Sequence, residues 1–212
     1  YIILIIRPQS FLLYLMLFLI PIMLIGGLIM SNIWFTSDWH FNHNKDFIYK
    51  ERGFKDIESM NEALVQRHNS LVRPDDIVYV LGDVVMGDIY EGVQYIKRLN
   101  GHLRIIKGNH DTDNKVKILT SECNNIEWVS NAVVHNISKT KDFFLCHYPV
   151  LCGDNISRHK MVSIHGHTHS KLIFPSSDSQ MLMYNVAVDA HNSCPVSQEE
   201  IIADLKNHYG WS

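Results

Sequence analysis

The sequence lacks the features of disulfide-rich scaffolds and of proteins that bind nucleic acids through clustered positive charge. Its four cysteines form no Cys-x-x-Cys pair, which favours reduced thiols of an intracellular protein over a disulfide framework. Lysine and arginine total 19 against 22 acidic residues, so the chain has no excess of positive charge for gripping a phosphate backbone. A small nucleotide, or a single strand entering a cleft, stays compatible with this charge. No linker or low-complexity tract divides residues 30–212, which therefore predict a single domain.

Charged residues are absent from Phe11 to Met30, a run long enough to span a membrane. A cleaved signal peptide fits poorly, because the run is too long and no alanine precedes Ala63. Only Ser31 and Asn32 separate the run from the first expected strand, which leaves little chain to cross the headgroup layer. We therefore interpret residues 1–29 as upstream translation before an initiating Met30, which predicts a cytoplasmic protein. The alternative is a membrane anchor through residues 11–30.

Short apolar runs alternate with helical patterns in the first half of the chain, as in an α/β fold. This half predicts strands at 33–37, 77–81 and 103–106, and helices at 56–72, 90–99 and 113–123. The second half is richer in strands, which we expect at 126–130, 132–137, 143–146, 161–164 and 182–188. Residues 139–142 are a plausible hairpin turn, and a capping box at 197–200 opens a last helix that ends near His208.

Several of these strands are followed directly by side chains that can bind metals. Ligands of open α/β sheets gather outside the carboxyl ends of the strands. The side chains at these positions are Asp38, His40, Asp83, Asn109, His110, Asp111, His147, His167 and His169. Each segment alone is weak evidence, because the chain has 13 histidines and most histidines in proteins are solvated or packed in a core. Their repetition at successive strand ends predicts a metal site.

The five segments together resemble the motifs of the calcineurin-like metallophosphoesterases, in particular the small phage and bacterial type. The motifs are Asp38-x-His40, Gly82-Asp83, Gly108-Asn109-His110-Asp111, His147 and Gly166-His167-x-His169. They occur in the expected order, and the resemblance covers residues 32–208. It implies a four-layer α/β/β/α sandwich with two central mixed sheets. It also implies two divalent metal ions, for which manganese is favoured over iron, zinc or nickel.

The resemblance also implies a role for each ligand. One ion would be bound by Asp38, His40 and His169. The other would be bound by Asn109, His147 and His167, with Asp83 bridging both. A bridging carboxylate offsets the repulsion between cations that lie about 3.5–4 Å apart, and a hydroxide shared by the two ions can attack phosphorus.

Four further residues are expected near the reaction. His110 would donate a proton to the leaving oxygen, and Asp111 would orient its imidazole. His43 and Arg158 are candidate substrate contacts, with a solvated loop as the alternative for each.

The sequence departs from the family pattern at two positions near the first motif. Asn42 stands where glycine is frequent and Trp39 where a smaller residue is frequent, which puts the shape of the pocket in doubt. The function expected is hydrolysis of a phosphomonoester or phosphodiester, with a small phosphate ester or a nucleotide as substrate. The alternatives are a single-strand nuclease and a non-catalytic scaffold of the same fold. The complete ligand set argues against the scaffold.

Overall fold

The structure is a computed structural model that describes residues 31–150, 161–174 and 182–211. The apolar run at 11–30, the interpretation of residues 1–29 and the candidate Arg158 lie outside the described residues. Within the ranges that are described, no helix is long and apolar enough to cross a membrane.

The first sheet has five strands in the order β4-β3-β2-β1-β9. They are β1 (Ile33–Thr36), β2 (Ile77–Val80), β3 (His102–Ile106), β4 (Ile126–Ser130) and β9 (Val196–Ser197). The first four are parallel and β9 is antiparallel to β1. The carboxyl ends of β1, β2 and β3 therefore meet at one edge of the sheet.

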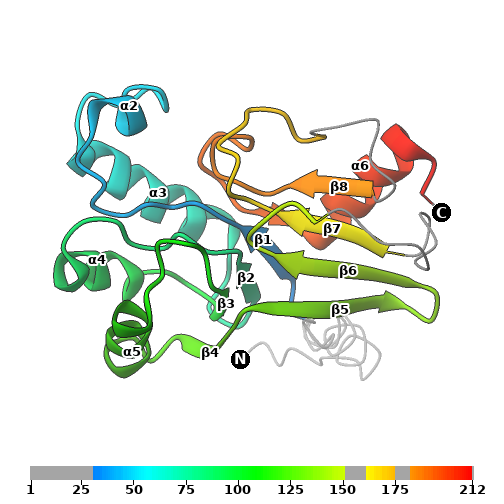
Figure 1. Ribbon diagram of the computed structural model, residues 1–212, viewed down its shortest axis with the longest axis horizontal. Helices are drawn as coiled ribbons and strands as arrows, with labels where there is room; N and C mark the ends of the chain where they lie inside the picture. The colour runs from blue at the N-terminus through cyan, green and yellow to red at the C-terminus, as the bar shows by residue number, and fades with distance from the viewer. Residues whose placement is uncertain (1–30, 151–160, 175–181, 212) are drawn as a thin grey trace, which may run out of the picture. The chain divides into compact units, whose positions relative to one another are not determined.

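The second sheet has the order β5-β6-β7-β8 and lies against the first one (Figure 1). Its strands are β5 (Ala132–Ser138), β6 (Lys141–Cys146), β7 (Met161–His165) and β8 (Leu182–Asn185). β5 and β6 form an antiparallel hairpin, whereas β6, β7 and β8 are parallel. The hairpin turn is shorter than expected, because Lys141 and Asp142 already pair in β6.

Five helices accompany the two sheets in the described part of the chain. They are α2 (Asp46–Tyr49), α3 (Ile57–Leu71), α4 (Ile89–Ile96), α5 (Asp113–Glu122) and α6 (Gln198–Tyr209). The Asp56 carboxylate and the Ser59 hydroxyl form a capping box at the start of α3. The Ser197 hydroxyl accepts the Glu200 amide at the start of α6, as expected from the sequence. The helix α6 ends at Gly210, whose φ of 65° is readily adopted by glycine.

Alternation along the parallel strands builds two cores, one on each face of the first sheet. In β2, Val78 and Val80 belong to the core that also contains Met60 of α3 and Ile96 of α4. The intervening Tyr79 belongs to the core between the sheets. A strand buried on both faces must be apolar throughout, which explains its continuous hydrophobic run. The α/β class with two central mixed sheets is therefore confirmed. Helix α6 contacts β1, β8 and β9.

The strand expected at 182–188 is wrong at its end. β8 stops at Asn185, and the chain then crosses to the first sheet. Ala187 forms a parallel bridge with Ser37, and the Val188 amide donates to the Ser37 carbonyl. This crossing brings Asp189 to the edge where β1 ends.

Candidate metal centre

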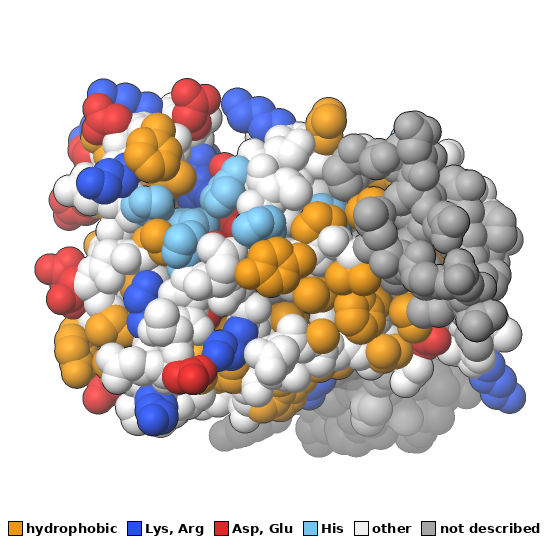
Figure 2. All heavy atoms as spheres, viewed as in Figure 1, with side chains coloured by type: hydrophobic (Ala, Val, Ile, Leu, Met, Phe, Trp, Pro, Cys, Tyr) orange, Lys and Arg blue, Asp and Glu red, His pale blue; other side chains and the backbone are white. Residues whose placement is uncertain are grey.

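The expected metal-binding side chains come from five strand ends and converge on one place. Figure 2 shows histidine side chains gathered in a patch on one face, with hydrophobic side chains beside it. Asp38 and His40 follow β1, Asp83 follows β2, and Asn109 follows β3. The remaining ligands come from the second sheet, His147 after β6 and His167 and His169 after β7.

Most of these ligands have a left-handed backbone that side chains rarely adopt. The φ angles are 58° at Asp38, 51° at His40, 56° at Asp83, 67° at His167 and 48° at His169. This conformation costs a residue with a Cβ roughly 1–2 kcal/mol. Backbone hydrogen bonds hold it, among them those from the Asp38 and His40 amides to the loop after β2. Backbone strain of this kind clusters at functional sites.

Two glycines let the strand-end loops approach each other more closely than any side chain would allow. A Cβ at Gly166 would lie 2.0 Å from the Ser37 hydroxyl oxygen, and a Cβ at Gly108 would lie 2.2 Å from Asp83 Oδ1. The amide next to Gly166, that of His167, donates to Asp38 Oδ2 over 2.9 Å. Gly166 therefore lets the loop after β7 lie against the end of β1 in the other sheet, and Gly108 lets the loops after β2 and β3 approach within the first sheet.

The first ligand group is formed by Asp38, His40 and His169. The Nε2 atoms of both imidazoles lie 3.7 Å from Asp38 Oδ1. Asp38 Oδ1 and His40 Nε2 are buried and have no hydrogen-bond partner among the described residues. A buried polar atom without a partner costs roughly 1–3 kcal/mol. A divalent cation bound between these atoms would remove that cost, so the residues fit the metal that the motifs imply.

The second group surrounds His147 Nε2. Asn109 Oδ1 lies 3.0 Å from this nitrogen, and His167 Nδ1 lies 3.1 Å from it. His147 Nδ1 donates to the Leu81 carbonyl over 2.7 Å, which leaves the Nε2 lone pair directed at the other ligands. Asp83 Oδ2 lies 3.6 Å from this Nε2.

Asp83 Oδ2 also lies 3.5 Å from His40 Nε2, so this oxygen stands between the two groups. The seven expected ligands are thus brought together at one site.

The protonation states suit metal binding. Burial raises the pKa of Asp38, but the His40 imidazole and the Ser37 hydroxyl outweigh it, and the net pKa falls below the ordinary value. Burial lowers the pKa of His40 and of His167, the latter helped by the neighbouring His147. At neutral pH the carboxylate is therefore charged and these imidazoles are neutral, which are the forms that bind metals.

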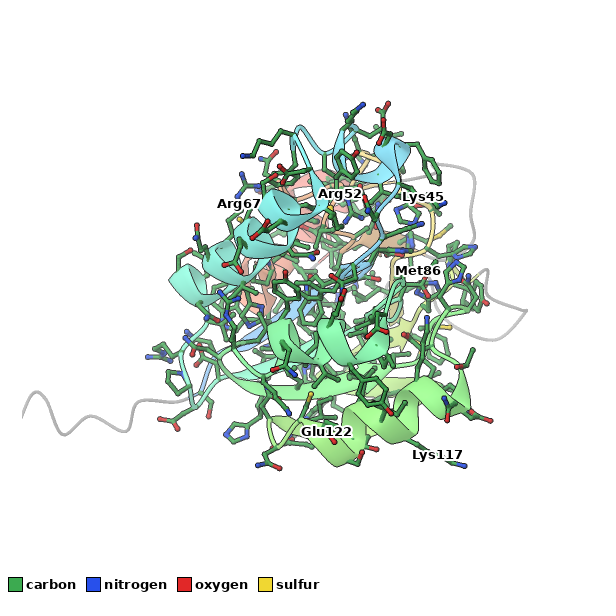
Figure 3. All side chains as sticks on the ribbon, turned by 90° about the vertical axis from the view of Figure 1, so that its left-hand side faces the viewer. Lys45, Arg52, Arg67, Met86, Lys117 and Glu122 are labelled. Atoms are coloured by element: carbon green, nitrogen blue, oxygen red, sulfur yellow. The ribbon has the colours of Figure 1, made fainter. Side chains whose placement is uncertain are left out.

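Arg52 and Asp189 support this centre and were not predicted as site residues. The Arg52 guanidinium, in the loop between α2 and α3 (Figure 3), makes two 2.9 Å hydrogen bonds to the Asp189 carboxylate. It also donates to the carbonyls of Asp38 and Trp39. Asp189 Oδ2 in turn lies 3.1 Å from His169 Nδ1, and this hydrogen bond raises the pKa of His169. His169 Nε2 is left facing Asp38.

The structure changes the role expected for Asp111. Its carboxylate accepts the backbone amides of Asp83, Val84 and Gly108 at 2.8–3.1 Å, and so ties together the loops after β2 and β3. The expectation that it orients the His110 imidazole is therefore wrong. The acidic neighbour of that imidazole is Asp83, whose Oδ2 lies 3.9 Å from His110 Nε2. His110 is 43% exposed and faces a hollow beside the ligands.

His43 also lines that hollow, with its ring stacked on His40 at a centroid distance of 5.3 Å. Burial and the adjacent His40 lower its pKa to about 4. The two departures from the family pattern lie elsewhere. Trp39 is 2% exposed and packs in the core, while the Asn42 side chain turns away and bonds to Asn61. Neither shapes the hollow.

The family model for calcineurin-like phosphoesterases matches residues 31–193. The chain belongs to this family. The calcineurin-like phosphoesterases hydrolyse phosphate esters with divalent metals, which agrees with the cluster of candidate ligands in the structure.

Relatives occur in archaea and phages. An uncharacterized protein of Methanocaldococcus jannaschii is 30% identical over 177 residues, 82% of this chain and 90% of that protein. The gene 66 protein of Mycobacterium phage L5 is 30% identical over 203 residues, 84% of this chain and 96% of its own. A solved structure of a protein of unknown function from Aquifex aeolicus has a TM-score of 0.61 at 23% identity, covering 81% of this chain and 97% of that one. That structure shares the fold.

Proposed function

We propose that this calcineurin-like phosphoesterase hydrolyses phosphomonoesters or phosphodiesters with two divalent cations, manganese favoured, bound at the centre described above. The observation that carries the proposal is the position of Asp83 Oδ2, 3.5 Å from His40 Nε2 and 3.6 Å from His147 Nε2. A carboxylate in this place can bridge two cations and offset their mutual repulsion.

The cations would supply the positive charge that lowers the pKa of an attacking water molecule and stabilises the phosphate oxygens in the transition state. The residues of the chain do the rest. Asp38, His40 and His169 would hold one cation, and Asn109, His147 and His167 would hold the other. His110 reaches into the hollow from the loop after β3, where its imidazole donates a proton to the leaving oxygen.

The test uses the full chain, stripped of metal with a chelator and then supplied with manganese. We expect it to bind two cations in calorimetry and to release p-nitrophenol from p-nitrophenyl phosphate or bis-p-nitrophenyl phosphate. Asp83→Asn removes the negative charge of the bridging carboxylate, and we expect it to lose at least one cation and about a hundredfold or more in kcat. Asp75→Asn, an exposed aspartate remote from the ligands, is the matched control and should change neither quantity.

Two results would overturn the proposal. One is binding of both cations with no hydrolysis of any ester, which would favour the scaffold. The other is an Asp83→Asn variant that keeps its cations and its activity.

A further inference from the structure

A hollow of about 610 Å³ opens beside the proposed cation site. The imidazoles of His40, His110 and His169 form one of its walls. A phosphoryl group held by the cations would therefore lie at this wall, with one of its ester substituents in the hollow. Sites for small organic molecules have volumes of roughly 300–1,000 Å³, so the space suits a substituent much larger than a methyl group.

Apolar side chains also line the hollow, and we call them its apolar wall. They are Phe47 and Ile48 of α2 and Met86, which follows β2. Met86 is labelled in Figure 3. Phe47 is 66% exposed although it lies next to a polar centre. Its ring meets the His43 ring nearly perpendicularly, at 84° and a centroid distance of 5.8 Å, so its orientation is set from one side. An aromatic ring and a thioether presented in this way favour contact with another planar ring.

The charges near the hollow limit the size of the ligand. Lys171 is its one basic lining residue besides the histidines, against the acidic Glu51 and Asp189, and the chain as a whole has a net charge of −3. Gripping several successive phosphates normally requires clustered lysine and arginine. A single nucleotide needs no such cluster, because its one phosphoryl group lies at the cations while its base lies against the apolar wall.

We propose that this hollow binds the base of a mononucleotide, with Phe47 as the residue that recognises the planar ring. This assignment rests on the proposed function, since it places the phosphoryl group at the cation site. The assignment adds a substrate class, namely phosphate esters in which a sugar links the phosphate to a neutral aromatic ring.

The experiment compares adenosine 5′-monophosphate with ribose 5-phosphate, which has the same phosphate and sugar but no base. Both are used as competitors of bis-p-nitrophenyl phosphate hydrolysis by the manganese-loaded full chain. Stacking on an aromatic side chain contributes roughly 1–3 kcal/mol per base. We therefore expect the inhibition constant to be about tenfold lower for the nucleotide.

Phe47→Ala should remove most of this difference and leave inhibition by ribose 5-phosphate unchanged. Phe47→Trp should restore it, because a larger ring keeps the stacking surface. Tyr90→Ala removes another exposed aromatic ring, 60% exposed on α4, and should not alter the ratio. Circular dichroism of each variant checks that the fold is intact.

The failures of the two proposals can be told apart. Equal inhibition constants for the two competitors, or the same ratio in Phe47→Ala, would overturn the base site while ester hydrolysis stands. A single-stranded oligonucleotide that competes more strongly than the mononucleotide would also overturn it. If the chain hydrolyses no ester, the proposed function fails, and calorimetry of the two ligands then measures the base contribution without turnover.

Discussion

His110 combines exposure with closeness to charge. Its backbone amide donates to Asp83 Oδ1 over 2.9 Å, while its half-exposed ring faces the hollow. A group that only held the loop would need the amide alone. The exposed ring beside the ligands agrees with the proton-donor role proposed above.

We expect His110→Ala to lower kcat for a phosphate ester of a simple alcohol by about 10²–10⁴-fold, the usual contribution of a general acid. With p-nitrophenyl phosphate the loss should be far smaller, because nitrophenolate leaves without being protonated. Steady-state kinetics on both esters measure this split, and calorimetry should still find both cations. His102→Ala, an exposed histidine at the start of β3, is the control. Equal losses on the two esters would contradict the assignment.

At the residue scale, the ligands could be predicted because their side chains follow apolar runs directly. Asp38 and Asp83 each come immediately after a strand-length segment. The role of Asp111 could not be predicted, because its partners are backbone amides, and these carry no sequence signal. Arg52 was missed for a related reason. Its partner Asp189 is 137 positions away, and only the crossing after β8 brings the two together.

At the scale of elements, Arg52 joins three segments that lie far apart in the sequence. It links the α2–α3 loop to the carbonyls after β1 and to Asp189 beyond β8. The exposed fractions of its side chain and that of Asp189 are 3% and 12%. A planar guanidinium can bind a carboxylate with two parallel hydrogen bonds, whereas an ammonium cannot.

We expect Arg52→Lys to lower the free energy of unfolding by about 2–3 kcal/mol, because the charge stays but the paired geometry is lost in a buried site. His169 should also bind its cation more weakly, because Arg52 would no longer hold the Asp189 carboxylate against His169 Nδ1. Urea unfolding and calorimetry with manganese measure the two effects.

Arg98→Lys is the matched control. Arg98 makes an equally paired contact with Glu62 at 2.6–2.7 Å, but on the surface, where the side chains are 47% and 38% exposed. Solvent screening limits such a pair to about 1 kcal/mol or less. A loss at Arg52 no larger than the loss at Arg98 would show that burial of the Arg52 pair contributes nothing.

The elements themselves could largely be predicted, since β1 to β4 and α3 to α6 have the expected periodicity. The shortest elements and the end of one strand could not be predicted. The short α2 has a single turn, too brief for a periodic signal, and β9 has only two residues. The end of β8 depends on a bridge to Ser37 in the other sheet, which no local pattern encodes.

For the molecule as a whole, the burial of many histidines couples stability to pH. Burial lowers the pKa of His68, which lies in the core that α3 and α4 form with the first sheet. It also lowers the pKa of His135, His165 and His191. Each of these rings is more easily protonated in the unfolded chain than in the folded one. All of them therefore lower the stability of the fold as the pH falls. His169, whose pKa is raised, instead adds stability as the pH falls.

His68 isolates the effect because it lies in the core between α3 and the first sheet, 1% exposed. Its Nε2 donates to the Asn100 carbonyl, and its Nδ1 has no partner among the described residues. Protonation would place an unpaired N–H and a charge in an apolar core, and the pKa is lowered to about 4. The stabilisation is complete above pH 6.5 and is lost as the pH falls from 6.5 towards 4.

A pKa lowered from 6.5 to about 4 corresponds to about 2–3 kcal/mol of stability between pH 7.5 and pH 4.5. We expect His68→Gln, whose amide can still donate to the Asn100 carbonyl, to remove that part of the pH dependence. Urea unfolding of both proteins at the two pH values, with a chelator present to exclude metal titration, measures the difference. At pH 7.5 we expect the variant to have a lower free energy of unfolding than the native chain, because glutamine packs less well in the core. At pH 4.5 this difference in free energy should become smaller or change sign. Parallel pH profiles for the two proteins would mean that the His68 ring is protonated as readily in the folded chain as in the unfolded one, and that another group causes the loss of stability in acid.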